Sequence, residues 1–520
     1  MEKYFGSSIF AIQSLRLALL KVARYALSIL IFYLSASFFG FSKDRDYWVL
    51  SSSLVLILSQ LFFGPLQDVY RIQFVADQAE HGVHKSLRTA SALHTAILIF
   101  SALLILIGVC LKATIASWIA PGLAGPERAD LSDMIAVVMP ALALQQLMAL
   151  LAAVLNSTSH FEFPEWAQIF SSSMALLFIV IGNERLGIYS LIAGTYSGYL
   201  LAIVMMLCHM KARYRSAFPF WSAPDRSILR YFSKACPLWI PFFAGQVLVY
   251  TEKALTSYLP QGQVSLFDYG RKLIELPMGV IIGITQSLFS VKISALHATK
   301  GLTAAAELSR DTLRFMIHAL TPLTAIFLCC GEAIYELFFF GADAGYHFQR
   351  DFSSMMRAFS LAIPALCIYA VSSQTLVTFG RQRFSALLST LFTLAVVLLD
   401  LRYFQCLGLF GLAFSWSAML FLSSVSQLAI VLIFSRVRFK RFFQEIIFQS
   451  FIPISVAWAI SHVFPFQASF SGWGLPAALG YIIFFLVISL MTQFAMIWIF
   501  RLPMHRPLRS LFGFTHERQR

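Results

Sequence analysis

Five ionisable side chains lie inside two neighbouring apolar segments, where a lipid bilayer would surround them: Glu252, Lys253, Arg271, Lys272 and Glu275. The segments cover residues 234–259 and 264–292, and the polar turn 260–263 joins them. Each segment has the ~20 residues that a helix needs to cross a hydrocarbon core of about 30 Å. At 1.5 Å of rise per residue, Glu252 would lie about 12 Å below that turn, at the depth of the hydrocarbon.

An ionisable side chain at this depth costs at least ~2.5–3.5 kcal/mol unless it meets a partner or a polar cavity. Arg271, Lys272 and Glu275 are spaced i, i+1 and i+4, so they share little more than a quarter of a helix circumference. This net positive face is typical of a site for an anionic ligand. Alternatively, Glu252 and Lys253 pair with neighbouring residues and only hold helices together; the sequence leaves both readings open.

The composition indicates a polytopic all-α membrane protein. The chain has 520 residues, 58% hydrophobic content and only 12% charged residues, and its mean hydropathy is +0.74. Long apolar runs favour helices over a transmembrane barrel, whose strands alternate apolar and polar residues. The N-terminus lacks a signal-peptide pattern, so we expect none. Seven cysteines without a CxxC pair indicate neither a disulfide framework nor a metal site.

The formal net charge of +14 reflects membrane topology rather than a nucleic-acid partner. Lysine and arginine concentrate in alternate loops, whereas the intervening loops are short and poor in both residues. By the positive-inside rule, the basic loops and both termini are expected to be cytoplasmic. The clearest basic segments are residues 211–234, 436–441 and 501–520.

Apolar runs between polar breaks predict about fourteen transmembrane helices. The predicted spans are 14–39, 47–72, 90–118, 132–157, 165–182, 187–210, 234–259, 264–292, 311–335, 352–379, 384–403, 408–435, 446–465 and 474–500. An even number of spans agrees with two cytoplasmic termini. The first span carries three cations, Arg16, Lys21 and Arg24, which are candidate substrate-binding residues. Arg24 lies deepest; for Arg16 and Lys21 the alternative is that the side chains snorkel to the interface.

Two sets of short matches indicate an internal duplication. Gly283, Gln286 and Phe289 each lie 219 residues after Gly64, Gln67 and Tyr70, and the tripeptide Pro-Ala-Leu at 140–142 recurs 224 residues later. Six helices per repeat return the chain to the same side of the membrane, so the repeats are parallel. We therefore predict an N-terminal lobe, 1–227, a C-terminal lobe, 228–441, and a C-terminal helix pair with a basic cytoplasmic tail, 442–520.

Four stretches resemble the MurJ/MviN family of lipid II flippases, within the superfamily of multidrug and oligosaccharidyl-lipid exporters. They read WIAPGLAG followed by MPALALQQLMALLAAVLNSTSHFEFPEWA; QVLVYTEKALTSYLPQGQVSLFDYGRKLIELPMGV; GRQRFSALL; and LDLRYFQCLGLFGLAFSWS. The resemblance extends from about Trp48 to Arg436 and is most specific between Tyr269 and Gly279. It implies a fourteen-helix transporter with a cationic central cavity in the bacterial inner membrane. Such a protein passes an undecaprenyl-diphosphate-linked saccharide to the outer leaflet by alternating access, as a monomer among membrane lipids.

The resemblance also implies roles for single residues. Lys272 falls where the family has an arginine of its substrate cavity, and Glu275 matches a nearby acid. Glu252 and Asp400 match acids implicated in sodium binding, so Na⁺ or H⁺ is the expected coupling ion and no organic cofactor is expected. The alternative for each acid is local pairing, Glu252 with Lys253 and Asp400 with Arg402.

The chain departs from the family in its first two helices. The first helix has Arg16 and Arg24 but lacks the family's glycine and aspartate, and the second reads LSQLFFGPL where the family has an arginine followed by E-G-A. A related undecaprenyl-linked exopolysaccharide unit is therefore an alternative substrate. A cation-coupled drug exporter and a non-transporting scaffold are alternative functions. We do not expect an enzyme, such as a membrane-bound glycan transferase, because His81 and His84 have no acid-rich metal motif beside them.

Overall fold

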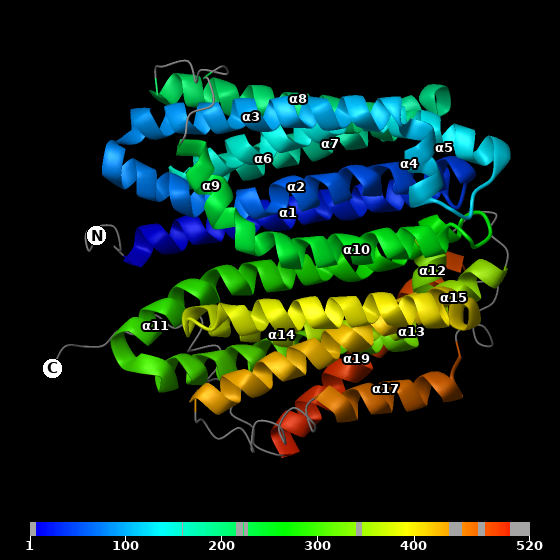
Figure 1. Cartoon of the computed structure of the whole chain (residues 1–520). Helices are drawn as coiled ribbons and strands as arrows, with labels where there is room; N and C mark the ends of the chain where they lie inside the picture. The colour runs from blue at the N-terminus through cyan, green and yellow to red at the C-terminus, as the bar shows by residue number, and fades with distance from the viewer. Residues whose placement is uncertain are drawn as a thin grey trace. The chain divides into compact units, whose positions relative to one another are not determined.

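The computed structural model describes residues 7–158, 160–214, 222, 227–339, 346–435, 450–465 and 474–499. All regular secondary structure among these residues is helical, as the sequence predicts (Figure 1). The chain divides into two compact units, Met1–Ser265 and Leu266–Arg520.

The first unit contains α1 (Ser7–Phe39), α2 (Lys43–His81), α3 (Val83–Cys110), α4 (Lys112–Ile119), α5 (Gly125–Val138), α6 (Ala141–Ser157), α7 (Glu162–Leu186), α8 (Tyr189–Tyr214), α9 (Ser227–Ala235) and α10 (Trp239–Thr256). The second unit contains α11 (Gln263–Cys329) from Leu266 onward, α12 (Gly331–Phe339), α13 (Tyr346–Ser360), α14 (Ala362–Thr378), α15 (Gln382–Ser435), α17 (Ile452–Val463) and α19 (Gly474–Ile499).

Eleven helical stretches of the described residues are long and apolar enough to cross a membrane. One of them, Gln382–Ser435 of α15, joins two helices that the sequence predicts as separate and bends at Gly408. Helix α11 as a whole also covers two predicted spans and bends at Gly301. The segment of α11 before Lys292, predicted as a span, is not among the eleven. Residues 446–449 of the thirteenth predicted span, 446–465, lie outside the described residues, and α17 within that span is a shorter apolar helix. The count of fourteen stays a prediction.

Each unit contains the same succession of helix lengths. A long helix ends at Cys110 in the first unit and at Cys329 in the second. A short helix follows, α4 with 8 residues or α12 with 9, and then α5 with 14 or α13 with 15. Next comes a helix of 17 residues, α6 or α14. Cys110 and Cys329 are 219 residues apart, which is the offset of the first set of sequence matches, and the duplication itself stays a prediction.

Glycines with positive φ lie at corresponding points of this succession. Gly82 and Gly301 both have φ of 80°, whereas Gly187 and Gly408 have φ of 53° and 52°. Side chains with a Cβ rarely adopt this conformation, so glycine allows the chain to turn between consecutive helices.

Helix α10 packs on helices of the first unit. The Trp239 indole N–H donates to the carbonyl of Leu61 at 3.0 Å, and the Tyr250 hydroxyl donates to the carbonyl of Trp118 at 3.0 Å. By its contacts α10 therefore belongs to the first unit, although the predicted C-terminal lobe begins at residue 228. The predicted lobe boundaries follow from the repeat rather than from these contacts, and they stay predictions.

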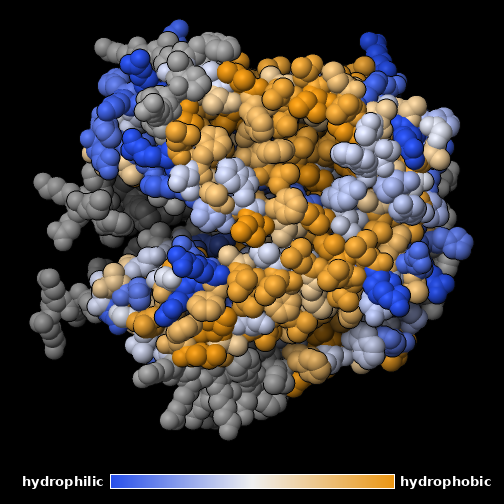
Figure 2. Space-filling view, viewed as in Figure 1, coloured by the Kyte–Doolittle hydropathy of each residue, from blue (hydrophilic) through white to orange (hydrophobic). Residues whose placement is uncertain are grey.

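The surface has the polarity of a membrane protein. Large apolar side chains such as Leu106, Ile181, Ile240 and Ile433 are exposed along the helices. Figure 2 shows apolar atoms over the middle of the helices and hydrophilic atoms near their ends. Such a surface is suited to lipid, because exposing this much apolar area to water would cost free energy.

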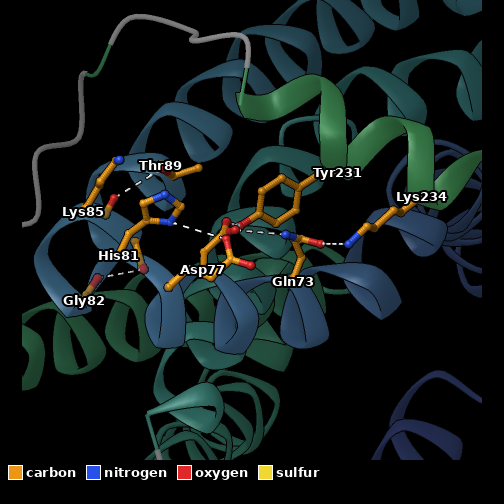
Figure 3. Close-up of polar contacts among 10 residues, drawn as sticks. Gln73, Asp77, His81, Gly82, Lys85, Thr89, Tyr231 and Lys234 are labelled. Carbon is orange, nitrogen blue, oxygen red and sulfur yellow. Dashed lines mark hydrogen bonds and ion pairs between the residues drawn. The ribbon is translucent and has the colours of Figure 1, made fainter.

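A polar network fixes the amphipathic helix α9 on the end of α2 (Figure 3). The Tyr231 hydroxyl donates to one oxygen of Asp77 at 2.8 Å, and the Gln73 amide donates to the other at 2.9 Å. Lys234 donates in turn to the Gln73 side-chain oxygen. Asp77 and Tyr231 are buried, so the hydrogen bonds satisfy polar groups that water does not reach.

The Asp77 carboxylate lies near Glu80 and His81, two further side chains of types that can ligate a metal ion. One ligand atom from each of the three residues lies within 4.8 Å of the others. The prediction that no acid-rich motif accompanies His81 was wrong, because α2 continues through His81, with Glu80 one position and Asp77 four positions before it. Both Asp77 oxygens already accept hydrogen bonds from Gln73 and Tyr231, so we interpret Asp77 as the anchor of α9.

We predict that Tyr231→Phe destabilises the first unit by about 1.5–3 kcal/mol, because a buried carboxylate loses a hydroxyl donor. Thermal unfolding of the purified protein measures the change, and trypsin digestion monitors release of α9. Tyr189→Phe is the matched control, since this tyrosine is exposed on α8. Equal unfolding temperatures for Tyr231→Phe and the unmodified protein would show that the network does not anchor α9.

Candidate functional site

The candidate site is the charged face of α11, whose first turn is capped from α2. One oxygen of the Asp46 carboxylate accepts from the backbone N–H of Gly262 at 2.6 Å, and the other accepts from the N–H of Ser265 at 2.8 Å. The Ser265 hydroxyl donates to Asp46 as well. The first N–H groups of a helix have no partner within it, so a carboxylate there satisfies them and complements the helix dipole.

Two interleaved ion pairs form the charged face. Lys272 Nζ lies 2.8 Å from Asp268 Oδ2, and Arg271 Nε lies 3.0 Å from Glu275 Oε1. Both pairs join residues four apart, which are neighbours on a helix surface. Asp268 was missed by the sequence analysis, although its spacing of four residues from Lys272 could have identified it.

Asp268 corrects the predicted charge of this face. Arg271, Lys272 and Glu275 alone predict a net positive cluster, but with Asp268 the two cations and two carboxylates are formally neutral. The neutral arrangement has a physical reason, because an unpaired cation at membrane depth is strongly disfavoured. An anionic ligand would therefore meet cations that already have partners.

The two pairs differ in exposure. The Asp268 side chain is 14% exposed, whereas the Glu275 side chain is 51% exposed. Arg271 is 21% exposed, so of its pair the carboxylate is the more accessible member. Solvent or ligand would reach Glu275 before it reaches Asp268.

An aromatic stack holds the Arg271 guanidinium. The guanidinium carbon lies 4.9 Å from the ring centroid of Trp416 on α15, a cation–π contact. Trp416 in turn meets the buried Phe359 of α13 edge to face, with centroids 5.7 Å apart. Beside Arg271, a Cβ at Gly270 would lie 2.2 Å from Met355 Cε, so a larger residue there would displace the end of the Met355 side chain. Sequence reasoning had no signal for Trp416, which follows Arg271 by 145 residues.

The predicted cations of the first helix lie on α1, in the first unit. Arg24 forms an ion pair with Glu165 of α7 at 3.3 Å and also donates to Gln168 of the same helix. Arg16 is exposed and Lys21 is partly buried. That these three residues contribute to a substrate site stays a prediction, but Arg24 already has an acid that neutralises it.

The predicted coupling acids are both buried, in different units. Glu252 on α10 and its neighbour Lys253 are 1% and 6% exposed. Asp400 on α15 is 2% exposed and accepts a hydrogen bond from the Ser415 hydroxyl, across the bend at Gly408. Glu252 belongs to the first unit and Asp400 to the second. A role of these two acids in cation coupling stays a prediction.

A family model described as "Lipid II flippase MurJ" matches residues 35–499 of this chain. The chain belongs to the MurJ lipid II flippase family. Because MurJ proteins are transporters and eleven helical stretches are apolar enough to span a bilayer, the chain is a multi-pass protein of the bacterial inner membrane. The resemblance to the MurJ/MviN family that the sequence motifs predicted is thus confirmed.

Two curated relatives are each named "Probable lipid II flippase MurJ". The protein of Buchnera aphidicola subsp. Acyrthosiphon pisum is 24% identical over 267 residues, which is 49% of this chain and 52% of that protein. The protein of Borreliella burgdorferi is 21% identical over 300 residues, 57% of this chain and 58% of that protein. The chain therefore spans little more than half the length of the curated relatives it matches.

Two solved structures share the fold. "Lipid II flippase MurJ, inward closed conformation" has a TM-score of 0.73 at 16% identity and covers 93% of this chain and 98% of that chain. An inward-facing multidrug resistance MATE transporter has a TM-score of 0.65 at 12% identity, with coverages of 81% and 98%. The predicted helical fold class is confirmed by the MurJ neighbour.

A double variant tests whether Arg24 has a structural role as the partner of Glu165. We predict that Arg24→Met destabilises the protein by about 1–3 kcal/mol, because Glu165 then remains charged without its cation. Adding Glu165→Gln removes that charge and is expected to restore both the unfolding temperature and transport. Arg16→Met, at an exposed position of α1, is the control. A double variant that is stable but inactive would contradict the structural role and favour substrate binding by Arg24.

Proposed function

We propose that the chain translocates an undecaprenyl-diphosphate-linked saccharide from the cytoplasmic to the outer leaflet by alternating access. The observation that carries the proposal is the MurJ family match over residues 35–499. Within that range, α11 presents Arg271 and Lys272, two cations that suit a diphosphate. The proposal includes a monomer with both termini in the cytoplasm, membrane lipids as its surroundings and no enzymatic step.

The two cations would divide the binding of a diphosphate. Arg271 offers a planar fork of N–H donors, which can contact two phosphate oxygens at once. Lys272 acts as a point charge and is more exposed, at 40% of its side chain. Trp416 and Phe359 keep Arg271 in place before the ligand arrives, so less conformational freedom is lost on binding.

Lipid II, the peptidoglycan precursor, is the substrate class that the family name supports. A related exopolysaccharide repeat unit is the second candidate, because the first-helix pattern of the family is missing and Arg24 pairs with Glu165. A cation-coupled drug exporter is less well supported. Organic cations need carboxylates that no lysine or arginine occupies, whereas Asp268 and Glu275 on the α11 face both pair with cations.

Coupling to Na⁺ or H⁺ is a further part of the proposal. Asp400 is buried and has an oxygen-bearing partner in Ser415, and a hard cation prefers such oxygen ligands. Glu252 is a buried carboxylate of the first unit that a proton or cation would neutralise. The observation that supports coupling is that both carboxylates are buried within apolar helices.

Complementation tests the proposed substrate. In a bacterium depleted of its own lipid II flippase, we predict that this chain restores growth and that Lys272→Ala abolishes the rescue. Lys272→Arg keeps the charge and adds a fork, so it is expected to retain activity. Matched protein levels are verified by immunoblotting. Normal rescue by Lys272→Ala would exclude Lys272 from the substrate site.

A transport assay with imposed gradients tests coupling. We predict that uptake of labelled lipid-linked saccharide into inverted vesicles depends on a sodium or proton gradient, and that Asp400→Asn removes this dependence. The amide keeps the size of the side chain and its hydrogen bonding but cannot neutralise a cation. Unchanged gradient dependence in both Asp400→Asn and Glu252→Gln would contradict a coupling role for these acids.

A further inference from the structure

The charged face of α11 contains its own anions at the position where an anionic ligand would bind. The Glu275 carboxylate contacts Arg271 at 3.0 Å, and a phosphate oxygen that reached Arg271 Nε would have to replace it. Asp268 has the same relation to Lys272 at 2.8 Å. The ion pairs are therefore in competition with any anionic substrate of this face.

Only one of the two carboxylates is well placed to leave. The Asp268 side chain is 14% exposed, whereas the Glu275 side chain is 51% exposed. An exposed ion pair contributes little stability, so it separates readily. If a ligand bound Lys272, the largely buried Asp268 carboxylate would have little access to solvent in place of its partner.

The cation of the same pair is fixed. Arg271 lies against Trp416 of α15, and the buried Phe359 of α13 supports that ring. Departure of Glu275 would thus leave a guanidinium already held in position. When a ligand leaves, Glu275 can return and prevent an unpaired cation at membrane depth.

We propose that Glu275 is a displaceable counter-ion, which competes with the substrate diphosphate for Arg271 and thereby speeds release. This inference rests on the proposed function, because it takes a lipid diphosphate as the ligand. It assigns Glu275 a role opposite to direct substrate binding: its charge weakens the complex. Trp416 is a positioning residue that keeps Arg271 available while Glu275 moves.

The test compares binding of undecaprenyl diphosphate to purified protein and variants by native mass spectrometry. Glu275→Gln removes the competing charge and is expected to tighten binding about two- to fivefold, while rescue of a flippase-depleted strain becomes weaker because release is slower. Glu275→Ala is expected to change binding in the same direction. Glu307→Gln is the matched control, since it removes the same charge from an exposed position further along α11.

Variants of Trp416 test the positioning role. Trp416→Leu is expected to weaken binding because Arg271 loses its aromatic contact, and Trp416→Phe is expected to retain most of the affinity. Equal losses in both variants would contradict the cation–π contact as the cause.

The outcomes separate the inference from the proposed function. If the unmodified protein binds no undecaprenyl diphosphate, the proposed function fails. If it binds but Glu275→Gln binds equally or more weakly, the counter-ion role fails and the proposed function stands. An equal gain in Glu307→Gln would also overturn the inference, because the effect would then come from net charge alone.

Discussion

The high free energy of an unpaired charge in hydrocarbon is the constraint on which the candidate site depends. Water is absent there, so a charged side chain needs an opposite charge or a hydrogen-bond donor nearby. The described membrane helices meet this need in two ways. The first is an ion pair between neighbours on one helix, as in Asp268 with Lys272 and Arg271 with Glu275. The second is a contact with a residue farther along the chain: Arg24 forms an ion pair with Glu165, and Asp400 accepts a hydrogen bond from Ser415. A transport function that uses these charged side chains must therefore act through groups that already have a partner.

This constraint also shapes how a substrate anion can be bound and released. A cation that waits without a partner would destabilise the empty carrier, whereas a permanently buried pair would not open for a ligand. The pair of Arg271 and Glu275 avoids both problems, because its cation rests on Trp416 and its anion is half exposed. In the proposed counter-ion role, the asymmetry between the two partners, rather than net positive charge, makes binding at this face reversible.

The fold was largely predictable because apolar runs of membrane length leave few alternatives to helices. The sequence also predicted where α15 is interrupted, since the gap between its two predicted spans falls at residues 404–407, beside Gly408. It could not predict that α10 packs with the first unit. That depends on contacts such as Trp239 with Leu61, between residues 178 positions apart.

The candidate site was predictable only in part. Helical spacing placed Arg271, Lys272 and Glu275 on one face, because such neighbours follow from 3.6 residues per turn. The same rule could have found Asp268. Trp416 and the Asp46 cap were beyond reach, since each meets α11 from a distant part of the sequence and no local pattern encodes that contact.

The central claim is that this chain moves a lipid-linked diphosphate saccharide across a bilayer. The most direct measurement reconstitutes the purified protein in liposomes that carry lipid II and follows, over time, the fraction that an external reagent can modify. The account predicts faster exposure of lipid II from the inner leaflet than in protein-free liposomes, with the acceleration lost in Lys272→Ala. Equal rates with and without the protein, under either a sodium or a proton gradient, would contradict the account.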